Sequence, residues 1–321
     1  MRKIGILTSG GDAPGMNAAI RAAVRAASAC GISTVGYRNG FRGLLSGEME
    51  ELDDRAVGNI LQRGGTVLGT SRCDEFLLAE ARARAAADMR SVGVDSLIVI
   101  GGDGSFRGAA AISAEAGIPV AGIPATIDND IAGTDDTIGF DTAVNTAVLA
   151  IDQVRDTSES TGMIFFVEVM GRQSGLLALA TGVAAGASGV LVPEARGELP
   201  ILVKRLRRSF ELCKHSHIIV VAEGEEAGGA FAVAERIGHQ LDHPYRVVVL
   251  GHVQRGGRPT AHDRIIASEM GARAAQALAA GRSGLMTAVR AGQVCEVPLL
   301  EDGRQSATGE GLLALAQALS G

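Results

Sequence analysis

The sequence predicts an α/β protein with largely parallel sheets and crossover helices. Two observations predict this class: short β-branched runs alternate with helical patterns along the whole chain, and 321 residues suit two domains better than one. The predicted strands are Ile4–Thr8, Thr34–Tyr37, Ser96–Ile100, Pro119–Ile123, Met163–Val169, Val190–Val192, Ile218–Ala222 and Arg246–Leu250.

Helical spacing of apolar residues predicts the first helix. Met16, Ile20, Ala23 and Ala27 recur at that spacing, and Gly31 follows as the predicted C-cap. A second helix is predicted over Phe106–Gly117. No Pro/Ser-rich linker or repeat marks a domain boundary, which we place near Gly139 from the order of the elements.

Composition excludes several classes of protein. A net charge of −6 and only 3% aromatic residues, none of them tryptophan, argue against nucleic-acid binding. No apolar run reaches the roughly 18 residues of a membrane span, and the start of the sequence lacks signal-peptide features. The cysteines form no CxxC pair. We therefore expect a soluble protein of the cytoplasm.

Three polar loops follow predicted strands. Thr8–Asn17 is a glycine-rich turn before a helix, Gly101–Ser105 places Asp103 after an apolar strand, and Pro124–Asp130 carries Asp128 and Asp130. Glycine turns at helix N-termini bind phosphate, and carboxylates bind Mg²⁺ or accept a proton. Taken singly, the loops have structural explanations as a tight turn, a helix cap and a solvated acidic turn. Together they predict phosphoryl transfer at the carboxyl edge of a sheet.

Asp128 and Asp130 are two residues apart, so a strand-like loop would turn both carboxylates to one face. One could then hold metal while the other accepts the proton of a hydroxyl.

Arginine supplies almost all the positive charge, since the only lysines are Lys3, Lys204 and Lys214 and no Walker lysine is present. Arg72, Arg172, Arg246 and Arg255 stand near predicted strand ends. Guanidinium groups bind phosphate oxygens in a bidentate manner, although an isolated arginine is more often a surface ion-pair partner. Several of them together predict a substrate that carries its own phosphate.

Six motifs occur along the chain in the order TSGGDAPGMNA, RGGT.LGTSR, GGDGS, TIDNDI.GTD.TIGFDTA, VEVMGR and LGH.QRGG. In these motifs and in their order, the sequence resembles the ATP-dependent bacterial 6-phosphofructokinase family over essentially its whole length. The resemblance implies two three-layer α/β/α domains with the active site in the cleft between them. It implies a larger ATP-binding domain of residues 1–139 and 251–304, and a smaller sugar-phosphate-binding domain of residues 140–250 and 305–321, which ends with the helix Gly309–Leu319. The implied reaction is Mg²⁺-assisted transfer of the ATP γ-phosphoryl group to the 1-hydroxyl of fructose 6-phosphate, in a homotetramer.

The resemblance also implies residue roles. Asp128 corresponds to the general base and Arg172 to the cation of the transition state, with Thr126 and Gly11 also in the catalytic set. Asp103 and Asp130 are implied metal residues. The implied ATP contacts are Gly11, Phe41 beside the adenine, Arg72, Cys73, Gly102, Asp103, Gly104, Ser105 and Gly108. The implied sugar-phosphate contacts are Thr126, Ile127, Asp128, Met170, Gly171, Arg172, Glu223, Arg246 from a neighbouring subunit, His252, Val253, Gln254 and Arg255.

Departures from the family pattern carry further expectations. Gly104 and Ala125 stand where pyrophosphate-using relatives have aspartate and lysine, which predicts ATP as donor. Met163 replaces an arginine that reaches the 6-phosphate. One charge-assisted contact of about 1.5 to 3 kcal/mol is therefore missing, and the identity of the acceptor stays open.

The implied effector site is only partly retained. Arg21, Arg25, Arg155 and Lys214 match it, whereas Asp54, Ser188 and Leu212 do not, so we expect weak or no activation by ADP. The alternatives left open are a pyrophosphate-dependent kinase, a kinase for another sugar phosphate, and a nonenzymatic sugar-phosphate-binding subunit.

Overall fold

A computed structural model describes residues 3–195, 197–212, 216–225, 228–300 and 308–319. The chain divides into two compact units, each with its own sheet. Unit 1 comprises Met1–Thr126, Asp130–Thr142 and Arg255–Ser306, and unit 2 comprises Ile127–Asn129, Ala143–Gln254 and Ala307–Gly321. Each unit is a sheet between two helical layers, which confirms the predicted fold class.

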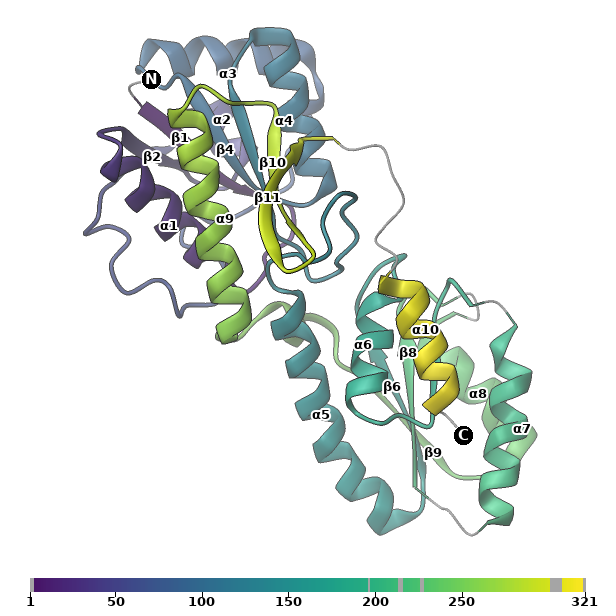
Figure 1. The fold of residues 1–321 in the computed structure, drawn as a ribbon. Helices are drawn as coiled ribbons and strands as arrows, with labels where there is room; N and C mark the ends of the chain where they lie inside the picture. Colours follow the sequence, from purple (N-terminus) through teal and green to yellow (C-terminus); the bar gives the residue numbers. More distant parts are fainter. Residues whose placement is uncertain (1–2, 196, 213–215, 226–227, 301–307, 320–321) are drawn as a thin grey trace. The chain divides into compact units, whose positions relative to one another are not determined.

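Unit 1 contains a seven-stranded sheet in the order β11-β10-β5-β4-β1-β2-β3 (Figure 1). Its central pairs are parallel, and β3 and β11 are antiparallel to their neighbours at the two edges. The strands are β1 (Lys3–Ser9), β2 (Ser33–Tyr37), β3 (Met49–Leu52), β4 (Ser96–Gly101), β5 (Val120–Pro124), β10 (Leu285–Arg290) and β11 (Gln293–Pro298).

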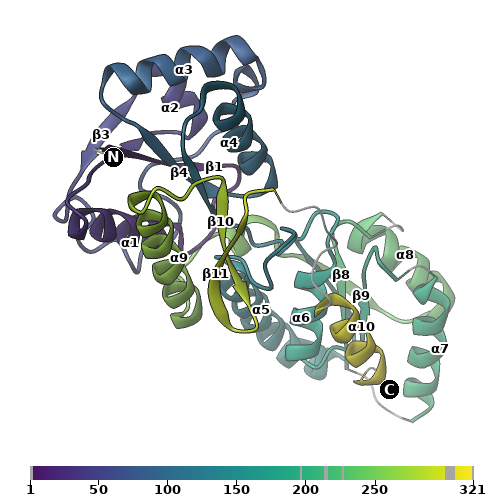
Figure 2. The same cartoon turned by 45° about the horizontal axis from the view of Figure 1, so that its top comes forward.

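Alternate residues of the unit 1 strands pack against different helices. Leu7, Leu97 and Val99 join the core beneath α2, α3 and α4, while α1 and α9 pack together over the opposite face (Figures 1 and 2). The helices are α1 (Met16–Ala29), α2 (Phe41–Ser46), α3 (Ala79–Ser91), α4 (Asp103–Ala116) and α9 (Ala261–Ala279), with the short 3₁₀ helices η1 (Asp74–Leu77) and η2 (Gly251–Arg255). As predicted, α1 ends before Gly31, whose φ of 72° suits glycine.

Unit 2 has a parallel four-stranded sheet in the order β7-β8-β6-β9. Its strands are β6 (Ile164–Val169), β7 (Gly189–Leu191), β8 (His217–Ala222) and β9 (Tyr245–Val249). Phe165 and Val167 face α5, α6 and α10, whereas Ile164 and Phe166 face α7 and α8. These helices are α5 (Phe140–Thr161), which begins in unit 1, α6 (Leu176–Ala184), α7 (Glu198–Glu211), α8 (Gly229–Leu241) and α10 (Thr308–Leu319).

Three strands, β3, β10 and β11, were not predicted. β3 is polar, with only Leu52 buried, and therefore lacks a strand signal. β10 is less uniformly apolar than the buried strands that were predicted, since it contains Thr287 and ends at the exposed Arg290, and its burial on both faces leaves no alternation to mark it. Within the described ranges no helix is long and apolar enough to cross a membrane.

Candidate active site

The three polar loops of unit 1 leave adjacent parallel strands at the same edge of the sheet. Ser9 pairs with Gly101, and Gly101 pairs with Pro124, so the ends of β1, β4 and β5 lie side by side. Residues 9–15, 102–105 and 125–130 therefore start from one row of strand ends. This is the edge where parallel α/β sheets place their ligands.

The first loop combines flexible backbone with a nearby cation. Gly10 and Gly15 have φ values of 90° and 116°, which favour glycine. A side-chain carbon on Gly11 would lie 2.1 Å from a guanidinium nitrogen of Arg255, which also donates to the carbonyl oxygen of Asp12 at 3.4 Å. The arginine therefore covers the turn with positive charge, as an anion-binding loop requires.

Asn17 fixes a second segment beside this loop, a role that the sequence analysis missed. Its buried amide donates to the carbonyl oxygens of Arg63 (3.0 Å) and Gly64 (3.2 Å) and accepts from the Val67 N–H (2.8 Å). The Thr70 hydroxyl donates to the carbonyl oxygen of Gly10 at 2.7 Å. Arg72 and Cys73 follow directly in the chain. The available signal was an asparagine on the otherwise apolar face of α1.

The second loop corrects one prediction. The helix begins at Asp103, three residues earlier than expected, and Gly102 is its N-cap, so Asp103 lies in the first turn rather than capping a later start. A carboxylate there interacts favourably with the helix dipole. The side chain of Asp103 is 51% exposed and pairs with Arg107, one helical turn on. Gly104 is exposed, while the Ser105 side chain is buried.

Phe41 has a different environment from the one expected beside adenine. Its ring stacks on Phe76 with centroids 4.1 Å apart, and only 5% of the residue is exposed. A side-chain carbon at Gly108 would lie 3.1 Å from this ring. Because Phe76 covers one face of the ring and the residue is buried, Phe41 does not offer an open stacking surface.

The third loop corrects a second prediction. Asn129 adopts a left-handed conformation with φ of 49°, so residues 128–130 are not strand-like and alternation does not turn Asp128 and Asp130 to one face. Asp128 is 2% exposed, and its Oδ2 lies 3.4 Å from Nε of Arg172. Asp128 groups with unit 2, whereas Asp130 groups with unit 1.

Arg172 stands on a strained turn after β6. Gly171 and Arg172 have φ values of 138° and 53°, and such a conformation is costly for arginine. The Arg172 N–H donates to the carboxylate of Glu223 at 2.7 Å. A side-chain carbon on Gly224 would lie 1.9 Å from the Arg172 carbonyl oxygen, so glycine is needed there. These contacts hold the backbone that presents the guanidinium to Asp128.

Two of the other predicted sugar-phosphate residues, Met170 and Glu223, lie at the carboxyl edge of the unit 2 sheet. Val169 pairs with Ala222, which places Met170 and Glu223 just beyond neighbouring strands. The fully buried Gln254 accepts from the Met170 N–H at 2.9 Å. His252 and Val253 are exposed on η2, and Arg255 belongs to unit 1. The exposed Arg246 lies at the opposite, amino end of the unit 2 sheet, since it pairs with Phe165 near the start of β6.

The residues matched to an effector site do not form one cluster within either unit. Arg21 and Arg25 lie on α1 in unit 1, where Nε of Arg25 is 3.9 Å from Asp54. Arg155 is in unit 2 and donates to the carbonyl oxygen of Ala185. Ser188 and Leu212 line a hollow of about 490 Å³ in unit 2. Lys214 lies outside the described residues.

Asp103 is the predicted metal residue whose surroundings can be described. Among the described residues, no group of three or more histidine, cysteine, aspartate or glutamate side chains could hold a metal. Mg²⁺ in phosphoryl-transfer enzymes is commonly held by one or two carboxylates together with substrate phosphates. The half-exposed carboxylate of Asp103, at a strand end and a helix N-terminus, fits such a role.

Comparison with known proteins identifies relatives over the whole chain. The family model described as phosphofructokinase matches residues 3–278. "ATP-dependent 6-phosphofructokinase 1" of Thermus thermophilus is 51% identical over 321 residues, which is 100% of both chains. "ATP-dependent 6-phosphofructokinase" of Bacillus licheniformis is 46% identical, again over 100% of both.

Solved structures agree in fold. Phosphofructokinase from Saccharomyces cerevisiae superposes with a TM-score of 0.88 and 32% identity, covering 99% of this chain and 47% of the yeast chain. A pyrophosphate-dependent phosphofructokinase from Marinobacter aquaeolei gives a TM-score of 0.86 at 23% identity, covering 99% of this chain and 91% of that one, and shows the fold alone. As its motifs predict, the chain belongs to the phosphofructokinase family.

Proposed function

We propose that this protein is an ATP-dependent 6-phosphofructokinase, a phosphotransferase with an alcohol group as acceptor. The observation that carries the proposal is the ion pair between the buried Asp128 and the partly exposed Arg172, which brings a base and a cation together. Identity of 46 to 51% over the full length to enzymes of that name supports it.

The chemistry is divided among these residues. Asp128 accepts the proton of the sugar 1-hydroxyl as the hydroxyl oxygen attacks the γ-phosphorus of ATP. The bond from the γ-phosphorus to the bridging oxygen breaks, and ADP leaves with its electron pair. Arg172 stabilises the charge on the transferring group, and the Gly171–Arg172 turn keeps its guanidinium in place. The phosphates of ATP bind the backbone N–H groups around Gly11 and the Gly102–Ser105 turn, together with Arg72.

Asp103 and Asp130 would hold Mg²⁺, which supplies neutralisation of phosphate charge when bound. The fructose 6-phosphate contacts would be Thr126, Ile127, Met170, Gly171, Glu223, His252, Val253, Gln254 and Arg255 of one subunit. The exposed Arg246 would reach the 6-phosphate of a neighbouring subunit, so we expect a homo-oligomer, a tetramer by family resemblance. We expect the enzyme to act in the cytoplasm and to respond weakly or not at all to ADP.

ATP is the proposed donor because the two positions that would exclude a nucleotide carry small residues. Gly104 is exposed, with open space where a side chain would begin. Ala125 is buried, and its N–H donates to the Gly101 carbonyl oxygen at 3.0 Å. A carboxylate at Gly104 would repel the α-phosphate of ATP, and a lysine at Ala125 would fill its space.

Initial rates for a panel of donors and acceptors test the proposal. We expect turnover with Mg²⁺, ATP and fructose 6-phosphate that exceeds the turnover with pyrophosphate or with tagatose 6-phosphate and sedoheptulose 7-phosphate. Activity with pyrophosphate alone would refute the donor, and a higher kcat/KM for another sugar phosphate would refute the acceptor. Tight binding of fructose 6-phosphate without turnover for any pair would indicate a nonenzymatic subunit.

A further inference from the structure

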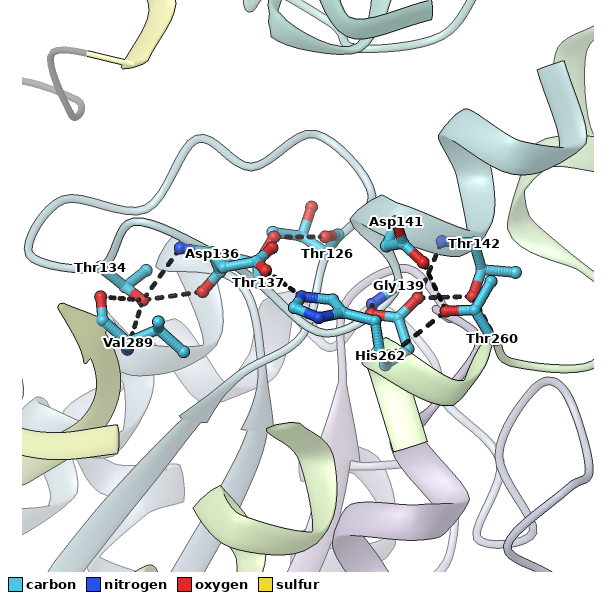
Figure 3. Close-up of polar contacts among 11 residues, drawn as sticks. Thr126, Thr134, Asp136, Thr137, Gly139, Asp141, Thr142, Thr260, His262 and Val289 are labelled. Carbon is cyan, nitrogen blue, oxygen red and sulfur yellow. Dashed lines mark hydrogen bonds and ion pairs between the residues drawn. The ribbon is translucent and has the colours of Figure 1, made fainter. Parts of the chain in front are cut away.

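The loop that carries Asp128 is closed at its base by two hydrogen bonds. Residues 126–139 lie between β5 and α5. Thr126 is on the arm that leaves β5, and Thr137 is on the arm that leads into α5, residues 134–139, which we call the returning arm (Figure 3). The Thr137 hydroxyl donates to the Thr126 carbonyl oxygen at 2.7 Å, and the Ile138 N–H donates to the Pro124 carbonyl oxygen at 3.1 Å. These bonds tie the returning arm to Thr126, two residues before the proposed base.

The returning arm is held by Asp263 on the first turn of α9. This fully buried carboxylate accepts from the N–H groups of Gly139 and Thr142, both at 2.8 Å, and from the Thr142 hydroxyl at 2.5 Å. The first N–H groups of a helix have no partner within it. Asp263 thus caps the start of α5 although it belongs to another helix.

Thr260, the N-cap of α9, links the same two helices. Its hydroxyl accepts from the Asp263 N–H at 3.2 Å and donates to the carboxylate of Asp141 at 2.6 Å. Its own N–H donates to the Thr142 hydroxyl at 3.0 Å. The Thr142 hydroxyl therefore both donates and accepts, and it has a defined orientation between Asp263 and Thr260.

His262 and Thr134 fix the returning arm at two further points (Figure 3). Nε2 of His262 lies 2.5 Å from Oδ2 of Asp136. The Thr134 hydroxyl accepts from the Val289 N–H of β10 at 2.9 Å and donates to the Asp136 carbonyl oxygen at 2.7 Å. The arm is thus tied both to the sheet and to α9.

Joining two helices through a buried carboxylate costs desolvation free energy. Burial raises the pKa of Asp263 to about 6, despite the three hydrogen bonds that favour the ionised form. An apolar contact would join the helices without this cost. Unlike an apolar contact, the carboxylate fixes the orientation of the start of α5, because its two oxygens accept from three donors on Gly139 and Thr142 at once.

We propose that Asp263 is a positioning residue for phosphoryl transfer, which acts through Thr142 and the returning arm to set the place of Thr126 and the Asp128 loop. The inference rests on the proposed function, since it assumes that Asp128 is the base. In this proposal the N-terminus of α9, defined by Thr260, His262 and Asp263, positions the Asp128 loop, although none of these three residues is a proposed substrate contact.

Three threonine variants test this inference. Thr142→Val removes the hydroxyl between Asp263 and Thr260 and keeps the shape, whereas Thr142→Ser keeps the hydroxyl. Thr34→Val is the matched control, since Thr34 is also buried in unit 1 and its hydroxyl donates to the Leu52 carbonyl oxygen at 2.7 Å, away from the loop. We expect kcat to fall about tenfold in Thr142→Val with the KM for ATP unchanged, because a displaced base slows chemistry without weakening nucleotide binding. The Ser variant and the control should stay within about twofold of wild type.

Equal kcat for the Val and Ser variants would overturn the inference, as would an equal loss in Thr34→Val. If Thr142→Val does not fold, His262→Gln serves instead, since this side chain is half exposed and the change removes the tie to Asp136. A wild-type kcat in that variant would then count against a positioning role for the α9 N-terminus.

Hydrogen exchange separates this inference from the proposed function. Exchange of the amides of residues 126–139 does not depend on turnover, so it remains informative even if the wild type lacks the proposed activity. We expect faster exchange there in Thr142→Val and unchanged exchange in Thr142→Ser and Thr34→Val. Unchanged protection of the loop in Thr142→Val would show that Thr142 and Asp263 do not hold it.

Discussion

Nε of Arg172 lies 3.4 Å from the carboxylate of Asp128, and the two side chains differ sharply in exposure, at 61% and 2%. The buried carboxylate is therefore oriented by a cation whose other nitrogens can still reach a ligand. Arg172 is itself held by the left-handed turn and by the bond from its N–H to Glu223. One contact thus joins the proposed base to the proposed transition-state cation.

Replacing Asp128 tests its role as base. Asp128→Asn keeps the size of the side chain and removes its ability to accept the proton, so kcat should fall by about 10²-fold or more. The measurement is the steady-state rate with ATP and fructose 6-phosphate. Asp152→Asn, at an exposed position of α5, is the matched control and should retain wild-type kcat. Full activity of Asp128→Asn would remove Asp128 from this role.

Gly104 should control the choice of donor. Gly104→Asp fits the open space beside the Gly102–Ser105 turn and puts negative charge near the phosphates, so the KM for ATP should rise about tenfold or more. Gly104→Asn has the same size without the charge, and we expect a much smaller rise. If the two variants raise KM equally, size rather than charge acts at this position.

Met163→Arg tests whether one phosphate contact is missing. Met163 directly precedes β6 and is partly buried against the core beneath α5 and α6. An arginine that restores a charge-assisted contact of about 1.5 to 3 kcal/mol should lower the KM for fructose 6-phosphate by about tenfold or more. Met163→Gln controls for the lost packing. No difference between the two variants would show that Arg246 and His252 suffice.

The raised pKa of Asp263 should make the stability of the protein depend on pH. Because its folded pKa of about 6 exceeds the ordinary 3.8, its contribution is fully present below about pH 4 and is lost as the pH rises through 6. The free energy of unfolding of wild type relative to Asp263→Asn should therefore decrease by up to about 3 kcal/mol between pH 4 and 7. Urea denaturation across this range measures the difference. Thr34→Val removes no titratable group, so the difference in free energy of unfolding between wild type and this control should not change with pH. If the stability of wild type relative to Asp263→Asn instead increased with pH, the predicted direction would be wrong.

His262 and Asp136 add to the pH dependence of the free energy of unfolding of wild type itself, since wild type and Asp263→Asn both contain them. Burial raises the pKa of Asp136. Partial burial lowers the pKa of His262, but the hydrogen bond and charge of Asp136 outweigh this effect and raise it overall. The pair is thus stabilising at low pH and loses that contribution as His262 deprotonates, which is the same direction as for Asp263.

Much of the fold could be predicted from local sequence, and the failures have physical causes. All eight predicted strands form, with ends shifted by one residue or so. Seven of them are largely buried apolar runs, and β9 packs Tyr245 and Val247 partly buried against a core. β3 could not be found, since its residues Met49 to Glu51 face outward and its place depends on pairing with β2. The early start of α4 at Asp103 reflects the Gly102 N-cap, which has no side chain to signal it.

The site was only partly accessible to sequence analysis. The polar motifs directly follow predicted strands, and this position predicted that they lie at one edge of the sheet. The pairing of Ser9 with Gly101 and of Gly101 with Pro124 places the three strand ends side by side. The left-handed conformation of Asn129 was not predicted, although asparagine tolerates it better than most residues. The stacking of Phe41 on Phe76 could not be foreseen, because it joins two segments that are distant in the sequence. Asp263 also escaped notice, since an aspartate near a helix start is ordinary until its partners on α5 are known.

The most direct test of the central claim is a crystal structure with Mg²⁺, a nonhydrolysable ATP analogue and fructose 6-phosphate. Because the strands before the Asp103 and Asp128 loops end side by side, we expect both carboxylates to face the γ-phosphate. Asp103 should lie at the metal, and Asp128 should be within about 3 Å of the sugar 1-hydroxyl. A complex in which the 1-hydroxyl lies against other residues, with Asp128 and Asp103 opening onto separate surfaces, would contradict it.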